Sequence, residues 1–372
     1  MKFVKWEDLR SGMRLARPIY NKNGVLLFER DSRLSSATIE SVKNFGLLGI
    51  YILEPAEPLP PMSEEDLEFE RFEIKMVSSI QAEIEKVLST KHQKSLPTIV
   101  SQIIRAYGHL DGKVHLYQNL RSRDDYVYRH MFNTAILCAM IASKMNVSVD
   151  DRLQVVSAAL IHDIGAVKSQ SPAVYGAVED RSVQDAFYGE LLRGCEILEE
   201  SFGTDGIVYR RICQQAIRAQ MEADHGEVNT KAKMITGAKI LMVAGKFDRL
   251  TAMSLNGQSE SEVRAVQEFL DHPEFYDPAV VKALIDSIYV VFPGVSVELN
   301  TGEKALVISE NPENILQPTV LSFRDNSILD LSLPGNSDIR IKDVMKTLDN
   351  RYIMNTEKLD AVGVPGAVAP QG

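Results

Sequence analysis

Apolar positions recur with a helical period through most of the chain between residues 67 and 291. Spacings of three and four residues between apolar side chains are typical of amphipathic helices, whereas strands alternate every second residue. The pattern is clearest in six stretches, at 128–145, 150–165, 184–200, 207–225, 232–253 and 277–292. We therefore expect an all-α domain of roughly bundle type over 67–291.

Residues 1–53 have a different pattern, in which short β-rich runs surround one amphipathic segment. The dipeptide Asn23-Gly24 lies between the runs "MRLARPIY" and "GVLLFE", and it indicates a β-hairpin. A helix is predicted in "SSATIESVKNFG", where a serine can cap its start and a glycine its end, and a last strand in "GIYIL". These elements predict a small α+β module. The run 54–66 is rich in proline and acid, so we expect an extended linker there.

The period changes again after the "FPG" at 292–294. Short alternating runs, "VSVELN", "KALVIS" and "PTVLSF", predict strands, and a β-rich subdomain is expected over 292–350. The tail 351–372 has the composition of a disordered segment. The fold class is therefore mainly α, with a small α+β module before the helical bundle and a short β appendage after it.

The composition of the chain argues against several classes of protein. Asp and Glu outnumber Lys and Arg by 51 to 41, which gives a net charge of -10 and argues against a nucleic-acid partner. The longest apolar run, around "AILCAMIA", is far shorter than the ~20 residues that span a bilayer, and the charged start does not resemble a signal peptide. Cys138, Cys195 and Cys213 have no metal-type spacing and predict buried thiols. We expect a cytoplasmic protein with no membrane partner.

A possible metal site is indicated by "ALIHDIG" at 159–165, where His162 and Asp163 are adjacent at the end of a helical pattern. Neighbouring side chains on a helix point about 100° apart. His162 and Asp163 can therefore reach the same ion only if a turn in the backbone directs both side chains toward it. Imidazole and carboxylate together are typical ligands of a divalent metal. His130 lies one predicted helix upstream on an otherwise apolar face, and it is a third candidate ligand.

These residues resemble the HD-GYP family, bacterial signalling proteins of the HD phosphohydrolase superfamily. The resemblance rests on "ALIHDIG", His130, the flanking "LRSGMRLARPIYNKNGVLLF" and the closing segment from "YDPAVVKALIDSIYVVFPG" to "PTVLSF", and so covers nearly the whole chain. It implies a helical domain in which His and Asp residues hold two or three iron- or manganese-type ions that hydrolyse cyclic di-GMP.

The resemblance also implies that several ligands have been lost. His130, His162 and Asp163 match the family's pattern, but Ala166 replaces the lysine that follows HDIG. Further ligand positions hold Asp185 for a histidine, Gln220 and Met221 for a histidine pair, and Gly245 for the last aspartate. The segment that names the family is reduced to "HGEVNTKAK", and the basic stretch after the last ligand has become "AMSLNGQ". Met offers a soft thioether where such metals prefer imidazole, so a dinuclear site is not expected.

A rearranged centre remains an alternative. Glu222 and His225 form a Glu-x-x-His pair on one predicted helix face, a spacing found in carboxylate-bridged metal sites. With Asp185 and the three matching ligands they would supply six candidates: His130, His162, Asp163, Asp185, Glu222 and His225. The competing interpretation of Glu222 and His225 is a solvated helix end.

We expect a degenerate HD-GYP protein that keeps the fold, lacks catalysis and acts through a protein partner in cyclic di-GMP related signalling. Its cofactor would be absent or a single weakly held iron or manganese ion. A metal-dependent phosphodiesterase with a rearranged site is the enzyme alternative, and a non-hydrolysing cyclic di-nucleotide sensor is a third hypothesis. The sequence leaves a homodimer open.

Overall fold

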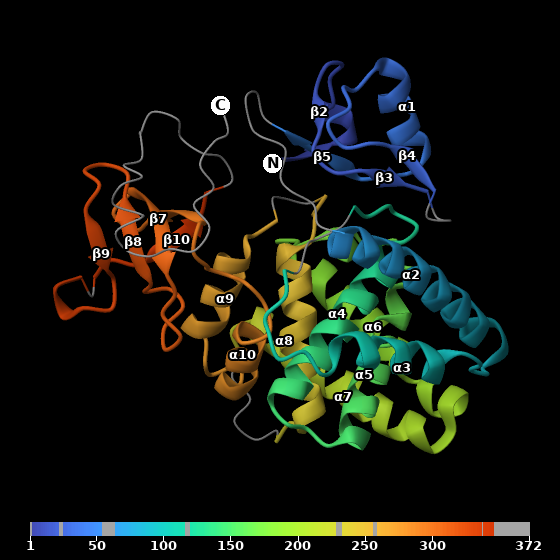
Figure 1. Ribbon diagram of the computed structural model, residues 1–372. Coiled ribbons are helices and arrows are strands. Elements are labelled where there is room, and N and C mark those ends of the chain that lie inside the picture. The colour runs from blue at the N-terminus through green and yellow to red at the C-terminus, as the bar shows by residue number, and fades with distance from the viewer. Residues whose placement is uncertain are drawn as a thin grey trace.

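The protein is described by a computed structural model over residues 2–21, 25–53, 64–115, 120–227, 233–255, 259–336 and 338–345. Its largest part is a bundle of helices (Figure 1). These are α2 (Glu64–Thr90), α3 (Leu96–Tyr107), α4 (Tyr126–Lys144), α5 (Val149–Ala159), α6 (Arg181–Cys195), α7 (Leu198–Asp224), α8 (Thr236–Thr251), α9 (Glu262–Asp271) and α10 (Pro278–Ile285). With small strands before it and a sheet after it, this bundle confirms the predicted fold class.

The start of α2 differs from the sequence expectation. Residues 64–66, which we expected at the end of the linker, already belong to this helix. Glutamate is a strong helix former and the prolines of the preceding run end at Pro61, so nothing in that stretch prevents a helix from starting there. Residues 54–63, the rest of the predicted linker, and the predicted tail 351–372 lie outside the described residues.

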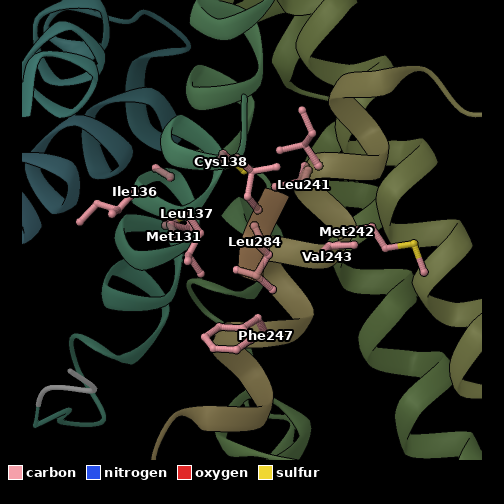
Figure 2. Close-up of a cluster of buried hydrophobic side chains, with 14 of the residues drawn as sticks. Met131, Ile136, Leu137, Cys138, Leu241, Met242, Val243, Phe247 and Leu284 are labelled. Atoms are coloured by element: carbon pink, nitrogen blue, oxygen red, sulfur yellow. The ribbon is translucent and has the colours of Figure 1, made fainter. Parts of the chain in front are cut away.

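Helix α4 forms the centre of the bundle because it is enclosed on every side. All of residues 130–142 are buried, and α4 packs against α2, α3, α5, α8 and α10. A helix that is apolar around its whole circumference is stable in such a position. Figure 2 shows its side chains Met131, Ile136, Leu137 and Cys138 together with Leu241, Met242, Val243 and Phe247 of α8 and Leu284 of α10. All three cysteines are free and buried, as predicted.

The N-terminal module has a small core of its own. Its sheet has the order β1 (Lys2–Lys5), β5 (Gly49–Leu53), β2 (Arg14–Leu15), and β3 (Ile19–Tyr20) pairs with β4 (Leu26–Phe28) as a hairpin. Strand β5 coincides with the predicted "GIYIL". Helix α1 (Ser36–Asn44) is capped by Ser35, whose hydroxyl accepts a hydrogen bond from the Thr38 amide. It stops before Gly46, whose positive φ of 66° suits a residue without a side chain.

This module contacts the helical domain through the loop that precedes α4. The Leu48 amide donates to the Arg121 carbonyl at 3.1 Å, and the Arg123 amide donates to the Gly46 carbonyl at 3.3 Å. The Lys5 ammonium also donates to the carbonyl of Leu255, at 2.8 Å. Loop 120–125 is therefore held from one side by the N-terminal module.

The C-terminal sheet is antiparallel, with strand order β10-β6-β7-β8-β9. Strands β6 (Ser296–Leu299), β7 (Lys304–Ser309) and β8 (Thr319–Ser322) lie in the three predicted runs, and β9 (Ile328–Asp330) and β10 (Ile341–Val344) extend the sheet. Apolar residues of β6, β7 and β8 belong to the same buried cluster as the helices. No described helix combines the length and the apolar character required to cross a lipid bilayer.

Candidate metal centre

The His-Asp pair lies in a tight turn just after α5. The helix ends at Ala159, and a short 3-10 turn, Ile164–Ala166, follows the pair. The ring of His162 folds back so that its Nδ1 lies 2.7 Å from the Ala159 carbonyl oxygen. This contact satisfies a carbonyl that the ended helix leaves without an amide partner, and it fixes the orientation of the ring.

The close approach of α6 requires a glycine at position 165, just after the turn that carries the pair. A Cβ at this position would lie 2.1 Å from the backbone carbonyl oxygen of Glu190 in α6. Gly194, one turn further along α6, is equally close to Gly165 itself, since its Cβ would lie 2.4 Å from the Gly165 nitrogen. Two residues without side chains therefore let α6 pack directly on the turn that carries His162 and Asp163.

Three of the predicted ligands meet in the interior. His130 of α4, His162 and Asp163 are all buried, with exposed fractions of 1%, 6% and 2%. The two histidine Nε2 atoms are 3.2 Å apart. Asp163 Oδ2 is 3.5 Å from Nε2 of His130, and Asp163 Oδ1 is 3.4 Å from Nε2 of His162. Among the described residues this is the one group of three or more side chains whose donor atoms could hold a metal ion.

His130 is oriented by a buried carboxylate behind it. Its Nδ1 lies 2.7 Å from Oδ2 of Asp248, a wholly buried residue of α8. The Asn133 amide donates to the same carboxylate at 2.9 Å, and Arg121 donates to both of its oxygens at 2.6 and 2.9 Å. A carboxylate that accepts from the far nitrogen of a ligand histidine is a common outer-shell arrangement in metal sites.

The protonation states of the cluster follow from burial and from the nearby charges. Burial, and after it the charge of Arg249, lowers the pKa of His130 to about 4. Burial also lowers the pKa of His162. Burial opposes ionisation of Asp163 and Asp248, but the positive charges of Arg249 and Arg121 outweigh it, so the pKa of each carboxyl lies below its ordinary value. At neutral pH both imidazoles are therefore neutral and both carboxyls are ionised.

These states determine which ring nitrogens carry the protons. A carboxylate and a carbonyl oxygen can only accept, so Nδ1 of His130 and Nδ1 of His162 are both donors. Both Nε2 atoms consequently present lone pairs to each other. Asp163 Oδ1, which has no hydrogen-bond partner in the described part of the chain, lies beside them. Three acceptor atoms thus converge on one small volume.

Such a convergence fits a single divalent cation. An ion bound to three atoms at about 2.0–2.2 Å each keeps those atoms roughly 3–3.5 Å apart. The two Nε2 atoms, 3.2 Å apart, and Asp163 Oδ1, 3.4 Å from Nε2 of His162, have this separation. Two imidazoles and one carboxylate form a donor set that suits borderline first-row metals such as iron. When bound, the ion would supply positive charge that polarises a phosphoryl oxygen or lowers the pKa of a water.

Of the positions where the family resemblance implies further ligands, Gly245 faces the cluster. A Cβ on Gly245 would be 3.8 Å from Nε2 of His162, so a side chain there would have pointed at the cluster. Gln220 donates to Asp224 at 2.7 Å, and Ala166 is 2% exposed, within the core. A second ion would therefore find no histidine at Gln220 or Met221, and the residues present do not fit a dinuclear centre.

The other predicted ligands do not join the cluster. His225 and Asp185 pair with each other at the end of α7, with Nε2 and Oδ1 3.0 Å apart, and Arg181 lies 3.1 Å from the other ring nitrogen. Glu222 lines a separate cavity of about 640 Å³, which also contains Lys239. The structure brings together His130, His162 and Asp163, and it does not assemble the rearranged six-residue centre.

The cluster opens on a cavity of about 380 Å³ between α6, α7 and α8. His162, Asp163, Lys246 and Arg249 are among the residues that line it. Its polar wall contains a linked set of side chains: the Tyr188 hydroxyl donates to Asp224 at 2.5 Å, and Lys246 donates to the same carboxylate at 2.8 Å. The cavity combines two cationic side chains with the candidate metal ligands.

Sequence reasoning did not identify Asp248, Arg249 or Arg121. The first two lie in the apolar run "LMVAGKFDRL", and charged residues inside such a run are a signal for a buried ionic contact. Arg121 carries no such signal, because it lies in a polar loop far from α8 in the sequence. Only the fold shows that it reaches Asp248.

Comparison with known proteins identifies the helical region. Residues 127–250 match the family model described as the HD domain, which confirms the HD-type helical domain expected from "ALIHDIG". Comparison with curated proteins finds no match. Among solved structures the chain is similar to Bd1817, a HDG"Y"P protein from Bdellovibrio bacteriovorus, at 14% identity and a TM-score of 0.40, over 77% of this chain and 98% of that one. A likeness that low carries no argument about activity.

Proposed function

Because residues 127–250 of this chain are an HD domain, we propose that the protein is a degenerate HD-GYP-type module that does not hydrolyse cyclic di-GMP. In this proposal it acts in signalling related to that nucleotide by binding a protein partner. The three clustered ligands hold at most one iron or manganese ion, and that ion has a structural role. The HD fold, the retained "ALIHDIG" turn and the altered ligand positions support the proposal.

The observation that carries this proposal is the lack of a side chain at Gly245. Its backbone is placed so that a side chain would have reached His162, yet it provides no ligand atom. Metal-assisted hydrolysis needs an ion held firmly enough to activate a water and to position a phosphoryl group. Loss of an outer-shell partner alone typically reduces metal affinity or activity by about 10- to 100-fold, and loss of a direct ligand is more severe. A site with three of its ligands is therefore expected to bind its ion weakly and to be inactive.

A metal-dependent phosphohydrolase is the second candidate, and one feature favours it. His162 and Asp163 form part of the wall of the 380 Å³ cavity, together with Lys246 and Arg249. Cationic side chains beside a metal site are the groups that bind a phosphoester. In this alternative a substrate would enter the cavity and reach the cluster through His162 and Asp163.

A combined metal and turnover measurement separates these candidates. The full-length protein would be purified anaerobically, its iron and manganese measured by elemental analysis, and cyclic di-GMP hydrolysis followed with and without added Mn²⁺. We expect less than one equivalent of metal and no turnover above that of His162→Ala. His272→Ala is a matched control, because His272 lies at the exposed end of α9.

Turnover that depends on His162 but not on His272 would overturn the proposal in favour of the phosphohydrolase. Binding of cyclic di-GMP without hydrolysis would instead indicate the sensor hypothesis. Binding would be measured by isothermal titration calorimetry on the same preparations as hydrolysis, so the two outcomes are directly comparable.

A further inference from the structure

Arg249 reaches the candidate metal cluster from the cavity side. It lies one helical turn after Gly245 on α8, and its guanidinium donates to Oδ2 of Asp163. The guanidinium also lies over the ring of Phe187, 5.4 Å from the ring centre. A positively charged side chain therefore touches the only carboxylate among the three clustered ligands.

The charges around the cluster are already balanced. Asp248 is paired with Arg121, and Asp163 is paired with Arg249. A dication entering this cluster would meet no excess negative charge, and it would lie within a few ångströms of a guanidinium. Like charges repel strongly at such separations when they are partly shielded from water.

The two arginines differ in their freedom to move. The Arg121 side chain is 1% exposed and bonded to both oxygens of its partner, so it is part of the core. The Arg249 side chain is 28% exposed and lies along a cavity wall. Arg249 occupies Oδ2 of Asp163 but leaves Oδ1 without a hydrogen-bond partner, 3.4 Å from Nε2 of His162. An ion can therefore bind only against the charge of Arg249 or after its guanidinium has moved into the cavity.

We propose that the positive charge of Arg249 lowers the metal affinity of the cluster formed by His130, His162 and Asp163. This inference rests on the part of the proposed function in which those three residues can hold one ion. Arg249 neutralises the ligand carboxylate when no metal is bound and opposes the ion when it enters. The same contact stabilises the metal-free protein, because it compensates a carboxylate that is almost wholly buried.

The test is the Mn²⁺ affinity of Arg249→Gln in the otherwise intact chain, measured anaerobically by isothermal titration calorimetry and by the loss of the free Mn²⁺ signal in electron paramagnetic resonance. Glutamine keeps a hydrogen-bond donor but removes the charge. We expect the dissociation constant to fall at least about tenfold, in line with the sensitivity of metal sites to their surroundings. Lys246→Gln is the matched control, since it removes one positive charge from the same cavity wall but from a residue paired with Asp224. Its dissociation constant should stay within about threefold of the wild-type value.

Thermal unfolding distinguishes this role from a purely structural one. Arg249→Gln should melt at a lower temperature than the wild type without metal, and added Mn²⁺ should restore its stability more than it stabilises the wild type. If Arg249→Gln does not fold without metal, Arg249→Lys replaces it in the test. Lysine keeps the charge but has a shorter side chain that withdraws it from Asp163, so this variant should bind Mn²⁺ more tightly than the wild type.

An unchanged dissociation constant in Arg249→Gln, an equal gain in Lys246→Gln, or no measurable Mn²⁺ binding by any of these proteins would overturn the inference. None of these outcomes alters the hydrolysis assay, on which the proposed lack of catalysis depends. Turnover by the wild-type protein would overturn the proposed function and leave the affinity comparison intact.

Discussion

The guanidinium of Arg121 donates to both carboxylate oxygens of Asp248, at 2.6 and 2.9 Å, although the two residues are 127 positions apart. Both side chains are buried, with exposed fractions of 1% and 0%. The same carboxylate accepts from His130, so the ion pair connects the loop before α4 to the candidate metal cluster. That loop is also the one held by the N-terminal module through Leu48 and Gly46.

Asp248→Asn should destabilise the protein severely. The substitution leaves Arg121 charged and buried without a counter-ion, a situation that typically costs about 3–5 kcal/mol. Urea unfolding followed by circular dichroism would measure the loss. Asp286→Asn makes the same change in a pair with Lys282 on the exposed face of α10, and it should have little effect because surface ion pairs contribute little. Equal stabilities of the two variants would contradict the role assigned to the buried pair.

Gly165→Ala should disturb the turn that carries the His-Asp pair. The added methyl group would lie 2.1 Å from the carbonyl oxygen of Glu190, so either the turn or α6 must shift. Overpacking of this kind typically costs about 1–3 kcal/mol. The control is Gly112→Ala, where an added Cβ would meet nothing within 4 Å. Chemical unfolding of both variants measures the difference, and a Gly165→Ala protein as stable as the control would show that the turn adapts without cost.

Gly245→Asp should strengthen metal binding. The Cβ of residue 245 would be 3.8 Å from His162 and 3.9 Å from Thr134, both ordinary contact distances, so the backbone accepts a side chain there. A carboxylate at this point adds a fourth ligand and a negative charge, and we expect Mn²⁺ affinity to rise about tenfold or more. Gly245→Asn has nearly the same size without the charge and is the control. If the two variants bind Mn²⁺ equally, the carboxylate does not reach the ion.

The Asp224 network should make stability depend on pH in the acid range. Burial opposes ionisation of Asp224, but the charge of Lys246 outweighs it, so the folded-state pKa lies below the ordinary value of 3.8. A carboxyl with a lowered pKa contributes stability above its unfolded pKa and loses it as pH falls through the folded value. Asp224→Asn should therefore be less stable than the wild type at pH 6, and this difference should shrink below about pH 4. A difference that stays constant between pH 6 and pH 3 would contradict the assigned charge interaction.

Much of the fold follows from local sequence patterns. The amphipathic period places α8 inside its predicted stretch and the starts of α4 and α5 within two residues of theirs, and "GIYIL" forms β5 where strand residues are expected. The spacing of apolar residues predicts these elements because a helix or strand buries one face, and the residues of that face must be apolar. The sequence held two signals at the start of α2. The run rich in acid and proline favoured a linker up to residue 66, whereas Ser63 and Asp66 have the spacing of a capping box, which predicts the observed start at Glu64.

The sequence alone proposed His130, His162 and Asp163 as ligands, but together with three other candidates. His162 and Asp163 are adjacent and His130 precedes them by one helix, and the structure brings the donor atoms of these three together. The same reasoning could not place Asp185, Glu222 and His225, because a helix face seen in sequence does not say which neighbour it meets. Tertiary structure paired Asp185 with His225 and directed Glu222 to another cavity.

Only the tertiary structure decided the electrostatic state of the site. Arg121 and Arg249 come from a loop and from α8, and their charges reach Asp248 and Asp163 through contacts between segments distant along the chain. Interaction energies between charges depend on separation and on exclusion of water, and neither is encoded in local spacing. The sequence thus determined which candidate ligands the chain carries, whereas the packing of α8 against α4 and the α5 turn decided that an arginine would face the carboxylate of Asp163.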